Sequence, residues 1–226
     1  MDALERDLKE HGLPQVAVMN GAQTQPTPDM LREYAAVMVT SDNAFMKDNR
    51  ALGSLMAQYV DDGHGVVIGG FVACGCPITG RWEGDYDPIS PAQSMRTDQP
   101  VMEVVVPDHP VLANVRCLRG NPAGETPYSP GHATGNTTTI AEWEFRKEEG
   151  EMLHVKRTPL VVEKYGLNGR VVGLNFTPTS SALPKDVISA HCGYDATTDG
   201  AQLMANALLY CALQPANAPA VKETEK

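Results

Sequence analysis

Two short segments carry the thiol and imidazole groups that could do chemistry in this chain. Cys74-Gly75-Cys76 lies in the first half, and His191-Cys192 lies near the C-terminus. Thiolate and imidazole together suit zinc, so these groups could bind one ion. Neither pair has the C-x-x-C type of spacing that zinc sites favour, and ordinary thiols explain them equally well. We therefore expect no metal and no cofactor.

The same side chains could instead form a nucleophile and its base. Cys74 or Cys76 would supply the nucleophile, and His132 or His191 would take its proton. Such a pair needs its side chains within hydrogen-bond reach, which the spacing along the chain does not establish. These residues are therefore candidates for a catalytic pair and nothing more.

An aromatic and acidic segment follows the cysteines. Trp82, Glu83, Asp85, Tyr86 and Asp87 lie within residues 77–99, a stretch rich in Pro, Gly and Ser. If this loop covers a binding crevice, it could bind a sugar or a basic peptide. A packed surface loop of the same composition would bind neither, and both interpretations remain open.

The first half of the chain alternates short apolar runs with amphipathic segments. We expect strands at residues 16–19, 35–39 and 65–70, and helices at residues 2–11, 28–34 and 47–62. Right-handed βαβ units place such strands in a parallel sheet that is covered on both faces. The ligand crevice of such a sheet lies at the carboxyl ends of its strands, here near Asn20, Ser41 and Gly69-Gly70.

The second half is richer in strands. Residues 101–106, 137–145, 160–165 and 170–176 predict strands, and Leu167-Asn168-Gly169 is a typical hairpin turn. We expect residues 77–99 and 116–136 to be long surface loops and residues 199–210 to form a helix that Asp199 caps. The predicted fold class is α/β, a flavodoxin-like three-layer sandwich with a mainly parallel sheet and added antiparallel strands. Residues 1–213 would form one domain, and residues 214–226 a disordered tail.

Charge and composition exclude several classes of protein. The formal charge is −10, from 18 basic and 28 acidic residues, which argues against a nucleic-acid partner. No apolar run is long enough to span a membrane, and residues 1–10 do not form a signal peptide. The five cysteines are scattered and odd in number, as in a reducing compartment, so we expect a cytoplasmic protein.

Five segments follow one another in a distinctive order: residues 34–41, YVDDGHGVVIGG within residues 55–70, DHPVLANV at 108–115, TPLVVEKYGLNGRVVGLNFTP at 158–178, and DGAQLMANALLYCA at 199–212. In this order they resemble the class I glutamine amidotransferase-like superfamily, in particular its divergent ThuA-like and β-galactosidase trimerisation-type members. The resemblance implies the α/β fold described above. It also implies that His109, in the recurrent D-H-P turn, has a structural role.

Two departures from the family pattern bear on activity. The resemblance implies a G-x-C-x-G elbow carrying a cysteine nucleophile, whereas here the strand ends in Ile68-Gly69-Gly70-Phe71-Val72. It also implies a His and a Glu in a G-V-Q-F-H-P-E pattern, where this chain has Thr177 and Thr179. Because a threonine cannot act as imidazole does, we expect no glutamine hydrolysis by the family mechanism.

A third departure concerns the start of the fold. The family begins with a central strand, whereas this chain begins at the first helix. We therefore expect a catalytically inactive, amidotransferase-like module that binds a protein partner or oligomerises, with the strand missing or supplied by another chain. The alternative is a hydrolase or carbohydrate-processing enzyme of the ThuA-like type that uses loops at the strand ends. A third hypothesis is a sensor that binds a small molecule or sugar at Gly69-Gly70, in a crevice that also includes Trp82, Thr177 and Thr179.

Overall fold

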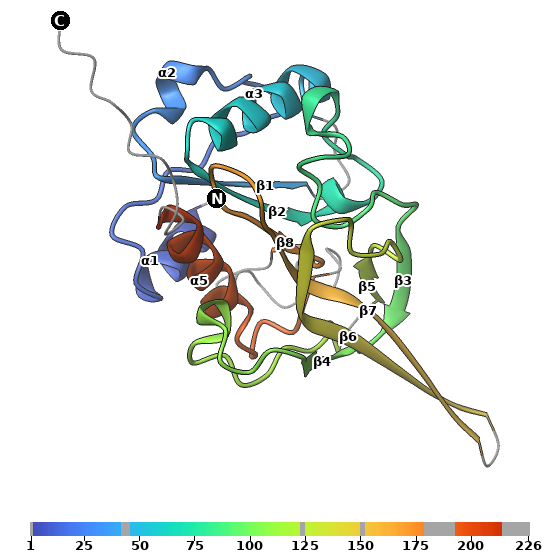
Figure 1. Cartoon of the computed structure of the whole chain (residues 1–226). Coiled ribbons are helices and arrows are strands. Elements are labelled where there is room, and N and C mark those ends of the chain that lie inside the picture. Colours follow the sequence, from blue (N-terminus) through green and yellow to red (C-terminus); the bar gives the residue numbers. More distant parts are fainter. Residues whose placement is uncertain (1, 42–45, 123–124, 150–151, 179–192, 214–226) are drawn as a thin grey trace, which may run out of the picture.

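A six-stranded mixed sheet organises the computed structural model, which describes residues 2–41, 46–122, 125–149, 152–178 and 193–213 (Figure 1). The strands are β1 Ala36–Ser41, β2 Gly65–Gly70, β3 Met95–Asp98, β4 Val101–Val104, β5 Glu125–Tyr128, β6 Thr137–Glu149, β7 Met152–Lys164 and β8 Val171–Leu174. The helices are α1 Asp2–Glu10, α2 Pro28–Leu31, α3 Asn49–Asp61 and α5 Gly200–Ala212, with short 3₁₀ turns at Phe71–Ala73, Gly80–Trp82 and Pro110–Leu112. The predicted tail at residues 214–226 lies outside the described residues.

The sheet combines a parallel half with an antiparallel half. Its order is β1-β2-β8-β7-β6-β4, and β3 pairs with β5 in a separate two-stranded sheet. The pairings β1–β2 and β2–β8 are parallel, whereas β8–β7, β7–β6 and β6–β4 are antiparallel. The prediction of a mainly parallel sheet was therefore wrong. The hairpin at Leu167-Asn168-Gly169 is confirmed, and because hairpins build this half it departs from a flavodoxin-like sheet.

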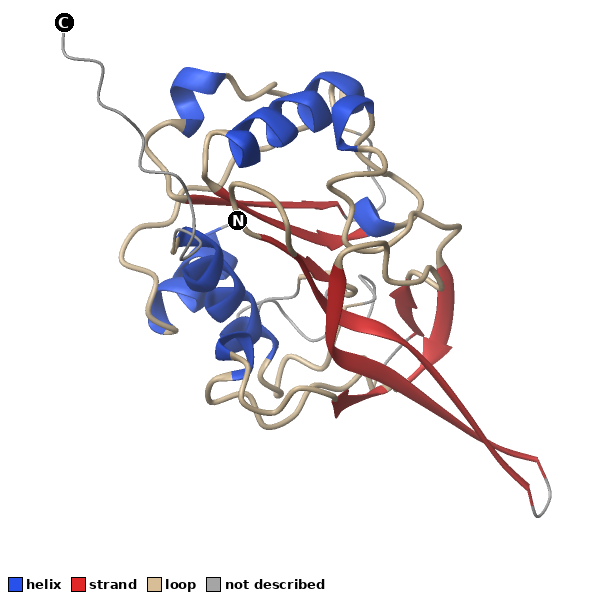
Figure 2. Cartoon of the chain, viewed as in Figure 1, coloured by secondary structure: helices blue, strands red, loops and turns tan. Residues whose placement is uncertain are grey.

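Helices lie on both faces of the sheet, as in a sandwich. α2 and α3 lie on one face, and α1 and α5 lie on the other (Figure 2). Thr27 caps α2 through a bond from Met30 N–H to its hydroxyl, as its position before Pro28 predicts. No helix in the described part of the chain is long and apolar enough to cross a membrane.

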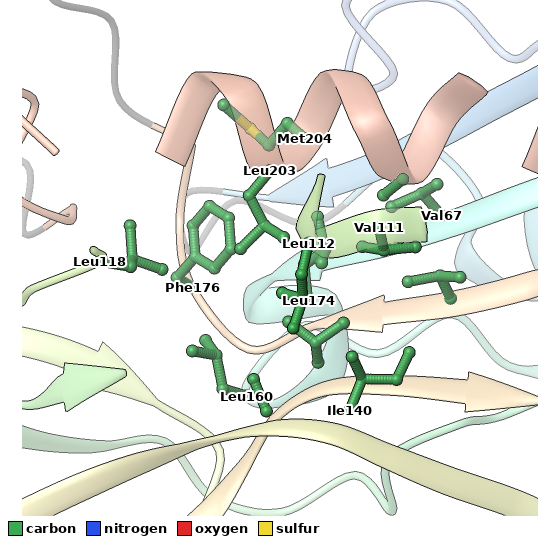
Figure 3. Close-up of a cluster of buried hydrophobic side chains, with 14 of the residues drawn as sticks. Val67, Val111, Leu112, Leu118, Ile140, Leu160, Leu174, Phe176, Leu203 and Met204 are labelled. Carbon is green, nitrogen blue, oxygen red and sulfur yellow. The ribbon is translucent and has the colours of Figure 1, made fainter. Parts of the chain in front are cut away.

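Two apolar cores follow from these layers. Leu203 and Met204 of α5 pack with Val67, Leu174 and Ile140 of the sheet (Figure 3). On the other face, Met56 and Val60 of α3 pack with Val66, Ile68 and Trp82. β2 and β8 therefore bury both of their faces, which explains why their sequences are nearly continuous apolar runs.

The apolar run at residues 16–19 is not a strand. Val18 and Met19 are 37% and 40% exposed, and the segment belongs to the connection between α1 and α2. Only Val16 packs against the α5 core. A four-residue apolar run does not distinguish a strand from a loop that buries a single side chain, and the expectation was wrong for that reason.

The two segments expected to be surface loops are largely packed. In residues 77–99, Ile78, Trp82 and Ile89 are at most 2% exposed, and in residues 116–136 Leu118 is fully buried. The two segments also pair with each other, through β3–β5 and through an isolated bridge between Ile89 and Ala133. Such pairing provides hydrogen-bond partners for backbone N–H and C=O groups, which in a solvent-facing loop would bond to water.

Asp199 precedes α5 but does not cap it with its side chain. Its carboxylate instead accepts backbone N–H bonds from Arg116 (2.7 Å) and Cys117 (2.9 Å). The Asp199 carboxylate therefore holds residues 116–117, in the loop after the D-H-P turn, against the start of α5.

Gly53 lies in the middle of α3 because another backbone segment passes close to it. A Cβ at this position would lie 1.9 Å from the carbonyl oxygen of Thr79. We expect Gly53→Ala to lower the free energy of unfolding by about 1–3 kcal/mol through overpacking. Helix propensity alone predicts the opposite sign, a gain of about 1 kcal/mol.

Chemical denaturation of the two proteins tests this expectation. Gln58→Ala, on the exposed face of the same helix, is the control and should change stability by about 0.5 kcal/mol or less. A Gly53→Ala protein as stable as the parent, or more stable, would show that α3 and the Thr79 segment can separate at little cost.

Candidate functional site

The carboxyl ends of the three parallel strands meet at one edge of the sheet. Ser41 pairs with Gly70 in the register of β1 and β2, and Gly69 pairs with Leu174 of β8. The Gly70 N–H donates to the Phe176 carbonyl at 2.7 Å, which brings Thr177 against Gly70. The structure therefore brings together Ser41, Gly69, Gly70 and Thr177 at the edge where open α/β sheets bind ligands.

Gly70, the last residue of β2, forms a sharp turn into the following 3₁₀ turn. Its φ is +59°, in the left-handed region that side chains disfavour. A Cβ there would lie 2.6 Å from the Ser41 carbonyl oxygen and 3.0 Å from the Thr40 hydroxyl. A sharp turn from strand to helix is the shape of a nucleophile elbow, but this one has no side chain and no room for one.

The sequence resemblance aligned Thr177 with a histidine, and the structure buries this residue. It is 7% exposed, and Phe176 before it is 1% exposed and packs edge-on against Tyr194. A hydroxyl in this position can donate or accept one hydrogen bond but cannot take up a proton near neutral pH. Thr179 lies outside the described residues.

The Cys74-Gly75-Cys76 segment is buried beside this edge. Both cysteines are 2% exposed, and Gly75 N–H donates to the Ala92 carbonyl. Burial, together with the neighbouring Cys76, raises the pKa of the Cys74 thiol to about 12. Since the thiolate is the reactive form, Cys74 is not an activated nucleophile at neutral pH.

This protonation state predicts how the thiols react. In the folded protein, we expect iodoacetamide at pH 7.5 to modify the part-exposed Cys117 readily and to leave the buried Cys74 and Cys211 unmodified. Peptide-resolved mass spectrometry before and after unfolding measures this directly, with Cys117 as the internal control. Labelling of Cys74 as fast as Cys117 in the native state would mean that the segment opens or that the thiol is ionised.

His132 contacts a serine. Its Nδ1 lies 3.1 Å from the Ser90 hydroxyl oxygen, and its backbone N–H donates to the same oxygen at 3.0 Å. His191 and Cys192 lie outside the described residues, so the proposed zinc ligands and the pair with His191 are untested. Among the residues that the structure describes, no three His, Cys, Asp or Glu side chains lie close enough to hold a metal ion.

Trp82 and Asn20 were also predicted to line the site, but they do not lie with the residues at the carboxyl ends of the parallel strands. Trp82 is fully buried and stacks on Tyr86 against α3, so the prediction that it lines a ligand crevice was wrong. An indole in this position anchors its loop to the helix.

Asn20 is exposed, and its side chain accepts the Ala22 N–H within its own turn. That turn is joined to the start of α3 by a bond from Lys47 N–H to the Gly21 carbonyl.

The resemblance also implied a structural role for His109, and its contacts agree with that role. Its Nδ1 accepts the Val111 N–H at 3.3 Å, and its Nε2 lies 3.2 Å from the Glu163 carboxylate. Glu163 also accepts the Tyr210 hydroxyl at 2.6 Å, which links β7 to α5. Because both ring nitrogens have partners, His109 fixes these elements together and has no free nitrogen to act as a base.

Sequence reasoning did not predict the burial of two polar residues. Asn175, which is 1% exposed, exchanges hydrogen bonds with the backbone of Ser129 and donates to the Pro159 carbonyl. Asp87, 6% exposed, lies in the electrostatic field of the buried Lys164. The position of Asn175 just before the Phe-Thr-Pro run was the available signal for the first. Nothing in the local sequence distinguishes Asp87 from its exposed neighbours.

A shallow hollow lies away from this edge, beside α3. It is lined by Arg50, Ser54, Thr79, Gly80, Arg81 and Glu83. Arg81 is already paired with Asp61 at 2.6 Å, and Glu83 accepts the Gly80 N–H. Two of its three charged side chains therefore already have partners, and we do not assign the hollow as a site.

Comparison with known proteins places the fold. The sequence matches no known family model and no curated protein. The structure is similar to the cytoplasmic proteins STM1381 from Salmonella typhimurium LT2 (TM-score 0.61, 16% identity, 93% of this chain and 86% of that chain) and STM3548 from Salmonella typhimurium (0.60, 15%, 92% and 85%). It is also similar to a ThuA-like protein from Parabacteroides merdae ATCC 43184 (0.54, 14%, 93% and 84%). The fold of this chain is therefore ThuA-like.

Proposed function

We propose that this chain is a ThuA-like, amidotransferase-like module that binds a partner and does not hydrolyse glutamine. The conformation of Gly70 carries the proposal. Gly70 has a left-handed φ of +59°, and a Cβ there would lie 2.6 Å from the Ser41 carbonyl oxygen. A nucleophile at this point would need the β1 and β2 strand ends to move apart.

The surrounding groups support the same proposal. Thr177 stands where an imidazole would be needed, and burial keeps Cys74 protonated. We also propose that the protein is cytoplasmic, since the similar Salmonella proteins are described as cytoplasmic and the cysteines are scattered and odd in number. No cofactor is needed for such a role.

A glutamine hydrolysis assay tests the proposal. The purified chain, incubated with glutamine alone and with hydroxylamine as an acceptor, should release ammonia at the rate of a buffer blank. A catalytic class I amidotransferase serves as the positive control. Release of ammonia that disappears after alkylation would overturn the proposal, because it would require an active thiol.

The Ser90–His132 contact favours a second candidate, a hydrolase of esters or glycosides. A hydroxyl oxygen 3.1 Å from an imidazole nitrogen is within the distance at which a base can accept the proton of a serine nucleophile. The same serine oxygen also accepts the backbone N–H of His132. A turn with a purely structural role would make this contact too.

Labelling with a fluorophosphonate and turnover of p-nitrophenyl esters and glycosides distinguish these roles. If the pair is catalytic, Ser90→Ala and His132→Ala should each abolish labelling and turnover, whereas Ser54→Ala, at a serine within α3, should not. If the wild-type protein shows neither labelling nor turnover, the Ser90–His132 contact is structural.

A further inference from the structure

The β6–β7 hairpin extends beyond the rest of the sheet as a two-stranded arm (Figure 1). Among the described residues, β4 pairs with β6 only as far as Glu144, and β8 pairs with β7 only from Val161 to Lys164. β6 and β7 continue to pair with each other as far as Met152. Beyond Glu144 on β6 and before Val161 on β7, the outer backbone edges of the arm therefore have no neighbouring strand in the described structure.

The two outer edges of the arm differ in the side chains that they carry. Arg146 and Lys147 on β6 are exposed and basic, and charged side chains on an edge strand discourage the addition of another strand. On β7, Met152, Leu153 and Val155 are 63%, 56% and 50% exposed. Because a two-stranded ribbon is marginal in water, a further strand at the apolar β7 edge would stabilise the arm.

The pleat of the sheet limits how a second copy of this chain can add to the β7 edge. Two identical strands that pair antiparallel across a two-fold axis oppose side chains on the same face, so odd positions face odd positions and even positions face even ones. With the axis at His154, Leu153 of each copy stands opposite Val155 of the other. On the other face, Met152 stands opposite Lys156, whose aliphatic stem can cover it. This register gives each exposed apolar side chain of the edge a partner.

Neighbouring registers of the same edge lose this match. An axis at Val155 places Leu153 opposite Arg157 and His154 opposite Lys156, and an axis at Lys156 places two ammonium groups opposite each other. An axis at Leu153 pairs that residue with itself and leaves Val155 without an apolar partner among the described residues. Of these registers, the one centred on His154 alone opposes Leu153 to Val155.

The open part of the β7 edge is long enough for this register. Met152 of the second copy reaches Lys156, and the edge becomes occupied only at Pro159 and Leu160, whose carbonyls accept bonds from Asn175. The two arms then point in opposite directions, so the bodies of the two copies lie at opposite ends of the shared sheet. Two short strands bury less surface than a stable dimer needs, and we therefore expect weak, concentration-dependent association.

We propose that two copies of this chain associate through the β7 edges of their arms and form a four-stranded sheet in the order β6-β7-β7-β6, with the two-fold axis at His154. A second copy is the partner because the edge complements itself in this symmetric register, which places no lysine or arginine opposite another. The inference deepens the proposed role as an interaction module and rests on it, since it names the partner.

Sedimentation velocity of the full chain, from micromolar to submillimolar concentration, should show a monomer–dimer equilibrium. Leu153→Ser removes the contact between Leu153 and Val155 twice in each dimer, so it should raise the dissociation constant by about tenfold or more. Lys147→Gln changes a charge on β6, the strand of the arm that lies away from the second copy. It is the control and should leave the dimer intact.

Substitutions at His154 test the register itself, because this residue faces its own copy across the axis. His154→Glu places two carboxylates opposite each other and His154→Lys places two ammonium groups there, so each variant should dimerise about threefold or more weakly than the parent. An equimolar mixture should form a heterodimer more tightly than either variant alone associates. Circular dichroism should show that every variant is folded, because Lys147, Leu153 and His154 belong to neither core.

A protein that stays monomeric at all concentrations would overturn the inference, as would a dimer that Leu153→Ser leaves intact or that Lys147→Gln disrupts as strongly. A mixture of the two His154 variants that associates no better than each alone would also contradict it. None of these results affects the glutamine hydrolysis assay, so failure of the dimer and failure of the proposed function are distinguishable.

Discussion

Replacing Asp87 by asparagine should stabilise the protein at pH 8 by about 2–4 kcal/mol, and by much less at pH 5. Asp87 is 6% exposed, and burial raises the pKa of its carboxyl group from 3.8 to about 7. The Trp82 side chain and the Lys164 ammonium oppose this rise, and the nearby Glu83 adds to it. The folded state therefore holds a proton that the unfolded chain releases.

The sign of the pH dependence follows from this difference. Below about pH 4 the carboxyl is protonated in both states and contributes no pH dependence. Between about pH 4 and 7 the unfolded chain loses its proton first, so the wild-type protein loses stability as the pH rises. Above about pH 7 both states are ionised and the full cost of the buried charge remains. Asparagine is neutral throughout, so the advantage of the variant should grow across this range.

Urea denaturation of the wild-type protein and of Asp87→Asn at pH 5 and pH 8 measures the effect. Glu33→Gln is a suitable control, because Glu33 is an exposed acid outside this loop. It should change the free energy of unfolding by about 0.5 kcal/mol or less at both pH values. If Asp87→Asn instead destabilises the protein at pH 8, the ionised carboxylate is the stable form, held by the ammonium of Lys164.

The charge of Asp87 also affects Lys164, a second buried charged residue. Its ammonium is buried and donates to the Thr134 hydroxyl (3.1 Å) and the Gly135 carbonyl (2.9 Å). Burial lowers the pKa of Lys164, and the charges of Asp85 and Asp87 oppose that change. Because the Thr134 hydroxyl also donates to the Asp87 carbonyl, Lys164 and Thr134 connect residue 87 to the end of β7.

Local signals in the sequence were enough to predict the parallel half of the fold. β1, α3 and β2 follow directly from two apolar runs around an amphipathic segment, and the βαβ rule then makes the strands parallel. The hairpin between β7 and β8 follows from Asn168-Gly169 in the same way. These elements are set by residues close together in the chain.

The arrangement of the antiparallel half depends on contacts between distant segments. β8 inserts between β2 and β7, and nothing near residues 171–174 specifies that position. The burial of Trp82 and Ile89 likewise depends on α3 and on the segment around Ala133, so composition alone suggested surface loops. The elbow without a nucleophile could be predicted from Gly69-Gly70, whereas the left-handed φ of Gly70 could not.

Asn175 is the residue at this edge whose loss should affect stability most. Its amide oxygen accepts the Ser129 N–H at 2.7 Å, and its amide nitrogen donates to the carbonyls of Ser129 (2.9 Å) and Pro159 (2.7 Å). Asn175 is only 1% exposed, so water would not replace these hydrogen bonds if the side chain were removed. The side chain therefore holds the residue 129 segment against the ends of β7 and β8.

Asn175→Ala should lower the free energy of unfolding by about 3–5 kcal/mol, because it leaves three buried backbone groups without a hydrogen-bond partner. For a chain of this size, the loss corresponds to a fall in Tm of roughly 10 °C. Asn168→Ala is the control, since the Asn168 amide makes a single exposed bond to the Asp61 carbonyl and its loss should cost about 1 kcal/mol or less. If both variants melt within a degree or two of the parent, the Ser129 segment detaches easily, and Thr177 next to it is not rigidly positioned at the strand ends.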